Sequence, residues 1–290
     1  MKILIIGGSG FLGSVLAKNY EKTHKITIGD INPPPTFITK SKFIRCELSD
    51  KSSLSNAIKD NDFVYHFAGI SDLNKSTQAP RETILSNILG TLNVLEECKK
   101  HRVKKIIFSS SIYADSEKGS FYKCSKFAAE KYIEEYYKSF GLKYTILRFG
   151  SLYGPYSDNA NGLYNIIQSI LTKKIFAYNG SLKSTREYIH IYDAVKTCIE
   201  ILRPKYNNKI INITGSEKIK MIDLKETLSE MLGTKIKSSF NNKDNRHHYD
   251  LTPYSINYEN ISNYKSNEYV DFNLGLKQTI EFIINQNAKY

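Results

Sequence analysis

Two hydrophobic patterns alternate along the first half of the chain. Short apolar runs bounded by polar residues predict buried strands, and the amphipathic segments between them predict helices. The predicted strands cover residues 2–6, 25–30, 43–46, 62–67, 105–108 and 143–147. The predicted helices begin near residue 11 and cover about residues 51–59, 76–101 and 122–140. This alternation is typical of an α/β fold with a doubly wound parallel sheet.

Three glycines follow the first predicted strand directly. Gly7, Gly10 and Gly13 have the spacing G-x-x-G-x-x-G and open an apolar helix. Such a turn brings backbone N–H groups and the helix dipole to one point, where a diphosphate can bind. Gly7 permits the turn, Gly10 lets the backbone approach the pyrophosphate, and Gly13 lets the helix pack closely. The motif predicts a Rossmann-type dinucleotide site, and the alternative is a plain glycine-rich turn.

Asp30 ends the second predicted strand, 17 residues beyond Gly13. An acid at this position accepts hydrogen bonds from a ribose 2′-hydroxyl and repels a 2′-phosphate. No Arg or Lys lies between Asp30 and Lys40 to bind such a phosphate, so the predicted cofactor is NAD. The alternative is that Asp30 only begins the turn continued by Asn32 and three prolines.

The pattern loosens beyond Gly150. Short segments rich in Asn, Tyr and Lys, including residues 238–245, predict a smaller C-terminal α+β lobe. The helix after Asp193 and the strand 209–213 are predicted to return to the main sheet. We therefore expect residues 1–150 and about 190–213 to form an NAD-binding Rossmann domain. Residues 151–189 and 214–290 would form the substrate-binding lobe.

Composition and charge exclude several functions. The formal net charge is +12, but the lysines are spread along the chain without an arginine-rich block, which argues against nucleic acid as a partner. The excess charge favours an anionic substrate. No apolar run approaches the roughly 20 residues needed to cross a membrane, and the first apolar stretch, cut at Gly7, is too short for a secretory signal.

Cysteine usage points to the same kind of protein. Cys46, Cys98, Cys124 and Cys198 lack CxxC spacing. We therefore predict no metal site and a reducing, cytoplasmic location.

A second group of polar residues could carry chemistry. Ser109, Ser110 and Ser111 end a predicted strand, and Tyr122 and Lys126 lie one turn apart on a predicted helix. An ammonium and a cationic nicotinamide would both lower the pKa of the tyrosine from about 10. Tyr122 could then accept a proton from a substrate hydroxyl, while a serine positions the oxygen. The alternative is a solvated polar pair on a helix surface.

Further motifs follow in a recognisable order. They read HFAG at residues 66–69, NILGTLNVL at 87–95, LRFGSLYGP at 147–155 and REYIHIYD at 186–193. Together with the glycine turn and the Tyr122/Lys126 pair, they resemble the extended short-chain dehydrogenases/reductases, in the NAD-dependent sugar epimerase/dehydratase branch that includes UDP-glucose 4-epimerase. The likeness covers nearly the whole chain.

The resemblance implies roles for individual residues. The catalytic residues it implies are Ser111, Tyr122 and Lys126. The cofactor-binding residues it implies are Gly7, Gly10, Phe11, Leu12, Asp30, Ile31, Glu47, Leu48, Phe67, Ala68, Gly69, Asn87, Ser109, Tyr122 and Lys126. It further implies a nucleotide-diphosphate sugar as substrate, in contact with Ser151 and Arg186. His190 and Asp193 are expected to be structural, with Asp193 capping the following helix. A homodimer through the helices after Ser76 and Tyr122 is also implied.

Departures from the family pattern narrow the expected reaction. Ile112 and Tyr113 follow Ser111, where the family's sugar 4,6-dehydratases carry Asp-Glu and its decarboxylases carry a Glu. We therefore expect oxidoreduction at C4 of the sugar, and first a 4-epimerase acting through a transient 4-keto sugar. The alternatives are a 4-dehydrogenase or ketoreductase, and a nonenzymatic dinucleotide-binding sensor.

Two details of the site have more than one interpretation: which serine is catalytic, and what Ser151 contacts. Tyr122 follows Ser111 by only 11 positions, fewer than is usual in the family. The register of the strand places the catalytic hydroxyl at Ser111, whereas alignment on Ile112-Tyr113 places it at Ser109. Ser151 stands where the family usually has Asn, so the nucleotide and the sugar stay open.

Overall fold

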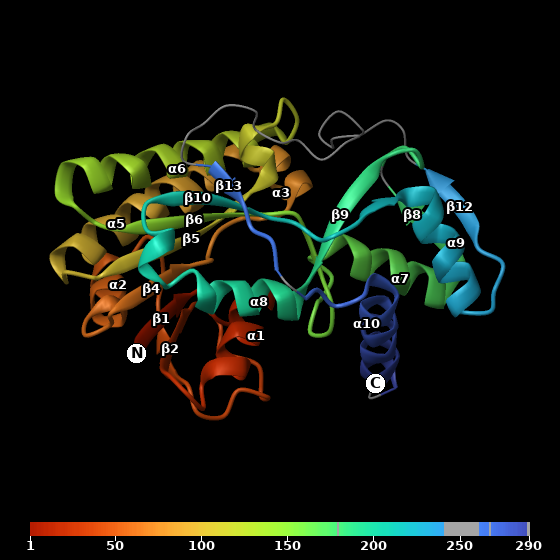
Figure 1. Cartoon of the computed structure of the whole chain (residues 1–290), viewed down its shortest axis with the longest axis horizontal. Coiled ribbons are helices and arrows are strands. Elements are labelled where there is room, and N and C mark those ends of the chain that lie inside the picture. Colours follow the sequence, from red (N-terminus) through yellow and green to blue (C-terminus); the bar gives the residue numbers. More distant parts are fainter. Residues whose placement is uncertain (179, 241–260, 267, 289–290) are drawn as a thin grey trace.

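The computed structural model describes residues 1–178, 180–240, 261–266 and 268–288. In this part of the chain, eight parallel strands form one sheet in the order β13-β10-β6-β5-β4-β1-β2-β3 (Figure 1). The strands are β1 (Lys2–Ile6), β2 (Lys25–Asp30), β3 (Lys42–Arg45), β4 (Phe63–His66), β5 (Lys105–Ser111), β6 (Tyr144–Phe149), β10 (Lys209–Ile213) and β13 (Ile261–Asn263). The predicted α/β class with a doubly wound parallel sheet is confirmed.

Helices cover both faces of this sheet (Figure 1). One face carries α1 (Phe11–Tyr20) and α8 (Ile191–Glu200), whose apolar residues share one core cluster with β1 and β2. The other carries α2 (Lys51–Ile58), α5 (Gly90–Lys100) and α6 (Ser120–Phe140), which share a second cluster. The strands are apolar on both sides because both faces are covered.

The helix predicted over residues 76–101 is interrupted at one residue and is helical again from Pro80 to Lys100. The segment forms α3 (Leu73–Gln78), α4 (Pro80–Thr83), the π-helix η1 (Ile84–Leu89) and α5. The break falls at Ala79, which has φ −128° and ψ 65°. Pro80 causes it, because a proline disfavours helical backbone at the residue before it. Strand β5 is also longer than predicted and continues through all three serines.

The remaining elements build a smaller lobe, to the right in Figure 1. It holds a three-stranded sheet, a two-stranded sheet and three helices among the described residues. These elements are β7 (Ser151–Tyr153), α7 (Gly162–Lys173), β8 (Ile175–Tyr178), β9 (Thr185–His190), β11 (Lys218–Lys220), α9 (Met221–Met231), β12 (Lys237–Phe240) and α10 (Phe272–Asn287). Of the segment 238–245, residues 241–245 lie outside the described part.

One strand departs from the predicted division of the chain. Residues 261–263, assigned by sequence to the lobe, form β13 at the edge of the main sheet, with Ile261 opposite Ile210. The strand is too short for its hydrophobic pattern to predict it. Strand β10 lies beside β6, as predicted. The division into two functional domains itself stays a prediction.

Within the described residues, no helix has the length and apolar character required to cross a bilayer. The same residues contain no cluster of three or more His, Cys, Asp or Glu side chains suited to a metal ion. All four cysteines are free thiols, and only Cys124 is exposed.

Candidate active site

The turn after β1 has the geometry of a phosphate cradle. Gly7 has a φ of +83°, and a Cβ there would lie 2.5 Å from the backbone nitrogen of Ala68. A Cβ on Gly13 would lie 2.5 Å from the carbonyl oxygen of Gly7. At Gly10, by contrast, the nearest atom would be 3.5 Å away. Gly7 and Gly13 are therefore required by the fold, while Gly10 leaves space beside the N-terminus of α1.

Asp30 faces this turn from the end of β2. Its carboxylate accepts hydrogen bonds from the backbone N–H of Ser9 (3.0 Å) and of Asn32 (3.0 Å). Both interpretations of Asp30, as a ribose-binding acid and as a turn residue, therefore have support. Asp30 binds the glycine loop through Ser9 and also binds Asn32 in the following turn. A carboxylate has further lone pairs with which to accept a ribose hydroxyl.

The other predicted cofactor residues lie at the carboxyl ends of adjacent strands. Phe67 and Ala68 each donate their backbone N–H to the carbonyl oxygen of Ile6, directly beside the glycine turn. Ile31, after β2, has 52% of its surface exposed. Glu47 and Leu48 follow β3, and Leu48 packs so closely on Gly90 that a Cβ there would come within 2.9 Å of it. Phe11 and Leu12 begin α1.

Asn87 is bound within the protein instead of facing open space. Its side-chain oxygen accepts from the N–H of Ile70 at 2.7 Å, and its amide donates to the Ile70 carbonyl at 2.9 Å. The same amide donates to the hydroxyl of Ser125 on α6 at 2.9 Å. Asn87 therefore fixes the loop after Gly69 against the helix that carries Tyr122, and its cofactor contact stays a prediction.

The three serines at the end of β5 have different partners. Ser109 donates its hydroxyl to the His66 carbonyl at 3.3 Å, and the buried Ser110 donates to Glu130. Ser111 accepts from the Tyr113 N–H at 3.2 Å, and its side chain also forms a hydrogen bond with that of Tyr122. The serine that adjoins the tyrosine is therefore Ser111, the one favoured by strand register.

Tyr122 and Lys126 lie side by side at the start of α6, beside the end of β5. The Nζ atom of Lys126 donates to the Ser109 carbonyl at 2.8 Å and lies 5.9 Å from the centre of the Tyr122 ring. Both side chains are buried, with 8% and 5% of the residue surface exposed for Tyr122 and Lys126. The solvated helix surface considered as an alternative is thus wrong.

The electrostatics of this pair differ from expectation. Burial raises the pKa of Tyr122 to about 12, and the hydrogen bond with Ser111 opposes the rise only in part. Burial also lowers the pKa of Lys126 to about 8, against the opposing effect of Glu130. The chain alone therefore does not lower the pKa of the tyrosine as predicted. Burial destabilises the phenolate by more than the hydrogen bond with Ser111 stabilises it.

The two predicted substrate residues lie on neighbouring strands of the lobe. Ser151 opens β7 and pairs with Tyr188 of β9. Arg186, on β9, is buried and donates to the Tyr178 hydroxyl at 2.7 Å and to the Thr185 carbonyl at 3.0 Å. Its guanidinium is thus held in place by the lobe, and its approach to a substrate stays a prediction.

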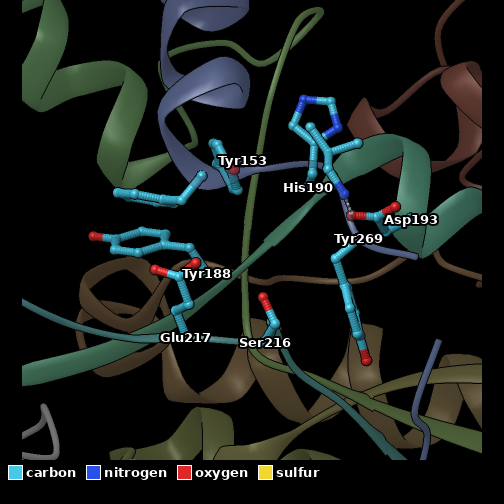
Figure 2. Close-up of a pocket in the computed structure, with 10 residues that line it drawn as sticks. Tyr153, Tyr188, His190, Asp193, Ser216, Glu217 and Tyr269 are labelled. Atoms are coloured by element: carbon cyan, nitrogen blue, oxygen red, sulfur yellow. Dashed lines mark hydrogen bonds between the residues drawn. The ribbon is translucent and has the colours of Figure 1, made fainter. Parts of the chain in front are cut away.

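A separate small pocket lies where the lobe meets α8, lined among others by Tyr153, Tyr188 and Glu217 (Figure 2). His190 caps α8 by accepting from the Tyr192 N–H at 3.4 Å. The predicted cap, Asp193, instead accepts from the Val270 N–H at 3.0 Å and so tethers the segment before α10 (Figure 2). Asp193 lies inside the first turn of α8, whereas His190 precedes the helix, where a capping side chain must stand. Both residues thus make contacts that hold the fold, and the absence of a catalytic role stays a prediction.

Comparison with known proteins decides the family. A family model described as "NAD dependent epimerase/dehydratase family" matches residues 3–214. The chain belongs to this family. A putative UDP-glucose 4-epimerase from Methanocaldococcus jannaschii is 30% identical over 245 residues, which cover 74% of this chain and 77% of that protein. A UDP-N-acetyl-alpha-D-glucosaminuronate decarboxylase from Bacillus cytotoxicus is 31% identical over 252 residues, 76% of this chain and 77% of its own.

A solved structure extends the likeness to the whole fold. The UDP-glucuronic acid 4-epimerase from Bacillus cereus, in complex with UDP-glucuronic acid and NAD, is 25% identical to this chain. It has a TM-score of 0.87 and covers 99% of this chain and 100% of its own. Relatives with similar sequence identity to this chain are named for different reactions. Sequence identity alone therefore does not indicate which reaction this chain catalyses.

The residues of this NAD-dependent epimerase/dehydratase family member fit the cofactor of its family. The space beside Gly10 would be closed by a larger side chain, and Asp30 stands at the same turn. The predicted cofactor, NAD, is confirmed at the level of the family.

Sequence reasoning missed a group of charged residues behind the pair. Arg148 on β6 binds Glu130 on α6 with both nitrogens of its fork, and it also approaches Asp115. The spacing of Lys126 and Glu130, four residues apart on one helix, is a signal that could have found it.

Proposed function

We propose that this protein is an NAD-dependent 4-epimerase of a nucleotide-diphosphate sugar, acting through a transient 4-keto sugar. The observation that carries the proposal is the buried Ser111–Tyr122–Lys126 group beside the glycine turn. Ser111 bonds to Tyr122, and Lys126 bonds to the Ser109 carbonyl at the same end of β5. The carboxyl ends of parallel strands are where α/β enzymes bind ligands. The names of the relatives, which include 4-epimerases, give independent support.

The side chains of the chain have defined roles in this proposal. The turn from Gly7 to Leu12, with Asp30, would hold NAD, which supplies the oxidant and then the reductant for C4 of the sugar. Tyr122 would take the proton from the C4 hydroxyl and return it, and Ser111 would position that oxygen. Lys126 would stabilise the phenolate form by its charge.

The chain also carries a reason to disfavour elimination and decarboxylation. Ile112 and Tyr113 stand after Ser111, so neither position offers a carboxylate for proton transfer. The ring of Tyr113 packs edge-on against that of Tyr122, with centroids 6.4 Å apart. An aromatic side chain beside the tyrosine, in place of a carboxylate, suits a reaction confined to C4.

The net charge and one buried cation support the substrate class that the relatives' names suggest. Arg186 would bind the diphosphate through charge-assisted hydrogen bonds, and Ser151 would contact the sugar. Tyr178 already orients the guanidinium, so less freedom would be lost on binding. The nucleotide and the sugar are left to experiment.

A panel of UDP, GDP, CDP and dTDP sugars tests the proposal. We expect one of them to be converted to its C4 epimer by purified protein, with no net change in NADH absorbance. Tyr122→Phe should lower turnover about 10²- to 10⁴-fold, the usual contribution of a general acid–base group, while NAD binding is kept. Tyr65→Phe, which removes the hydroxyl of another buried tyrosine, bonded to the Cys198 carbonyl, is the matched control.

Other outcomes would select the alternatives. Net accumulation of NADH with a 4-keto product would identify a dehydrogenase, and release of CO₂ or water from the sugar would identify a decarboxylase or dehydratase. Full activity of Tyr122→Phe would remove Tyr122 as the base. Tight NAD binding with no change in any sugar would favour a sensor.

We also propose a homodimer through α6 and η1. Large apolar side chains are about 40–50% exposed on both elements: Ile84, Leu85, Leu89, Phe121, Phe127 and Tyr132. Native mass spectrometry should therefore find a dimer, and Leu85→Glu should give a monomer. Leu274→Glu, which changes an equally exposed leucine on α10, should leave the dimer intact. A monomeric wild-type protein would contradict this proposal.

A further inference from the structure

A buried ion-pair network lies behind the candidate catalytic group. Glu130 has no exposed surface, and only 3% of the Arg148 side chain is exposed. Arg148 donates from Nε to Oε1 of Glu130 at 2.9 Å and from Nη2 to Oε2 at 2.7 Å. Ser110 donates to the same carboxylate, and Nη1 of Arg148 lies 3.4 Å from Oδ2 of Asp115. Both carboxylate oxygens of Glu130 are therefore bound.

The network joins the elements that carry the catalytic side chains. Ser110 lies on β5 between Ser109 and Ser111, and Glu130 lies on α6 one turn beyond Lys126. Arg148 comes from β6, and Asp115 ends η2 (Ile112–Asp115), the start of the short connection from Ser111 to Tyr122. A movement of any one of these elements would break a bond in the network.

Stability alone does not account for such a pair. Taking two charges out of water costs about as much as their attraction returns, and apolar replacements are often neutral or stabilising. The position of the pair is more informative than its strength, because it lies one helical turn from Lys126.

The network also affects the protonation of Lys126, as the groups around this side chain show. Glu130 and Tyr122 face it from α6, the Ser109 carbonyl accepts from it on β5, and His66 approaches it from β4. Burial lowers the pKa of His66 to about 3, so this ring is neutral near pH 7. The charge of Glu130 thus opposes the loss of the Lys126 proton that burial favours.

We propose that Glu130, held by Arg148, is a positioning residue. Its bond to Ser110 ties α6 to β5 next to the bond between Lys126 and Ser109, and so keeps the Lys126 ammonium beside Tyr122. The inference rests on the proposed function, since it assigns Lys126 a task in it. It adds a residue to the site that touches neither cofactor nor substrate and acts through Lys126.

Two neutral variants test this role. Glu130→Gln keeps the shape and removes the charge, and Glu130→Gln/Arg148→Gln removes both charges so that no buried ion is left without a partner. In each, we expect the alkaline limb of kcat/KM to move to lower pH by about one unit, the lower range for one close charge. Glu97→Gln, which neutralises another buried carboxylate on α5, is the matched control.

A second readout does not depend on turnover. The titration of Tyr122 can be followed by NMR on isotope-labelled tyrosine in the NAD-loaded protein, with the signal assigned by its loss in Tyr122→Phe. We expect its midpoint to rise by about one unit in both variants, because a neutral Lys126 no longer stabilises the phenolate. This holds even if no nucleotide sugar is turned over, which separates the failure of the two proposals.

Three results would overturn the inference. The first is a folded Glu130→Gln variant whose pH profile and Tyr122 midpoint match those of the wild-type protein. The second is a double variant whose pH profile and Tyr122 midpoint return to the wild-type values. That result would mean that only the net charge of the network matters, and not the position of Glu130. The third is a double variant that does not fold, which would assign the network to folding.

Discussion

At the scale of single residues, the hydroxyls of three consecutive serines have three different partners. Ser109 and Ser110 are bonded to His66 and Glu130, and Ser111 is bonded to Tyr122. We expect Ser111→Ala to lower kcat about 10- to 100-fold, the effect of losing a hydrogen bond to a charged group. Ser109→Ala on the same strand, assayed with the same sugar, should change kcat by less than threefold. A larger loss from Ser109→Ala would move the catalytic hydroxyl to Ser109.

The sequence predicts which residues form the candidate site, but not their electrostatic environment. Tyr122, Lys126 and Ser111 could be placed because strand register and helical spacing are local properties. The effect of burial on the tyrosine pKa could not, because it depends on side chains from β4, β5 and α6 closing around one point. The same reason hid Arg148, which meets Glu130 across 18 residues of chain.

At the scale of elements, the turn between β1 and α1 separates a folding role from a binding role. In Gly7→Ala, the left-handed backbone and the contact with Ala68 should lower the free energy of unfolding by about 1–2 kcal/mol or more. In Gly10→Ala, the new methyl has room, so stability should be unchanged while NAD affinity falls. Urea unfolding and calorimetric NAD titration measure the two effects. Equal NAD affinity in Gly10→Ala and wild type would contradict the cradle.

Elements with strong hydrophobic periodicity follow from their patterns, whereas an interruption does not show in the hydrophobic pattern. Strands β1 and β4 and helix α6 follow from their patterns to within a few residues. The segment 73–100 breaks at Ala79 although its apolar spacing continues, because Pro80 restricts Ala79 whatever the pattern. From Pro80 to Lys100 the backbone stays helical, with a π-helical stretch at Ile84–Leu89. The proline is visible in the sequence, so the break could have been predicted.

At the scale of the whole molecule, distant segments complete structures that the sequence shows only in part. β13 pairs with β10 across about 50 residues, and Val270 meets Asp193 over 77. Such pairings carry no local signature, since they arise when the lobe and the main sheet pack together. The parallel sheet itself was predictable because alternating strands and helices allow few other arrangements.

Two buried histidines make the stability of the whole protein sensitive to acid. Burial lowers the pKa of His66 to about 3 and of His190 to about 4, well below the unfolded value of about 6.5. Below about pH 6.5 these histidines are therefore protonated in the unfolded chain but not in the folded protein. The free energy of unfolding thus falls as the pH falls. Each histidine should remove about 2 kcal/mol between about pH 6.5 and 5, at 1.36 kcal/mol per pH unit.

A capping substitution isolates one of these contributions. His190→Asn keeps an acceptor for the Tyr192 N–H and removes the titrating ring. Over the same pH range, the slope of unfolding free energy against pH should be smaller in this variant by about 1.36 kcal/mol per unit. Urea titrations at several pH values measure both slopes. Equal slopes would mean that His190 is protonated in the folded protein, and so that its burial does not exclude the charge.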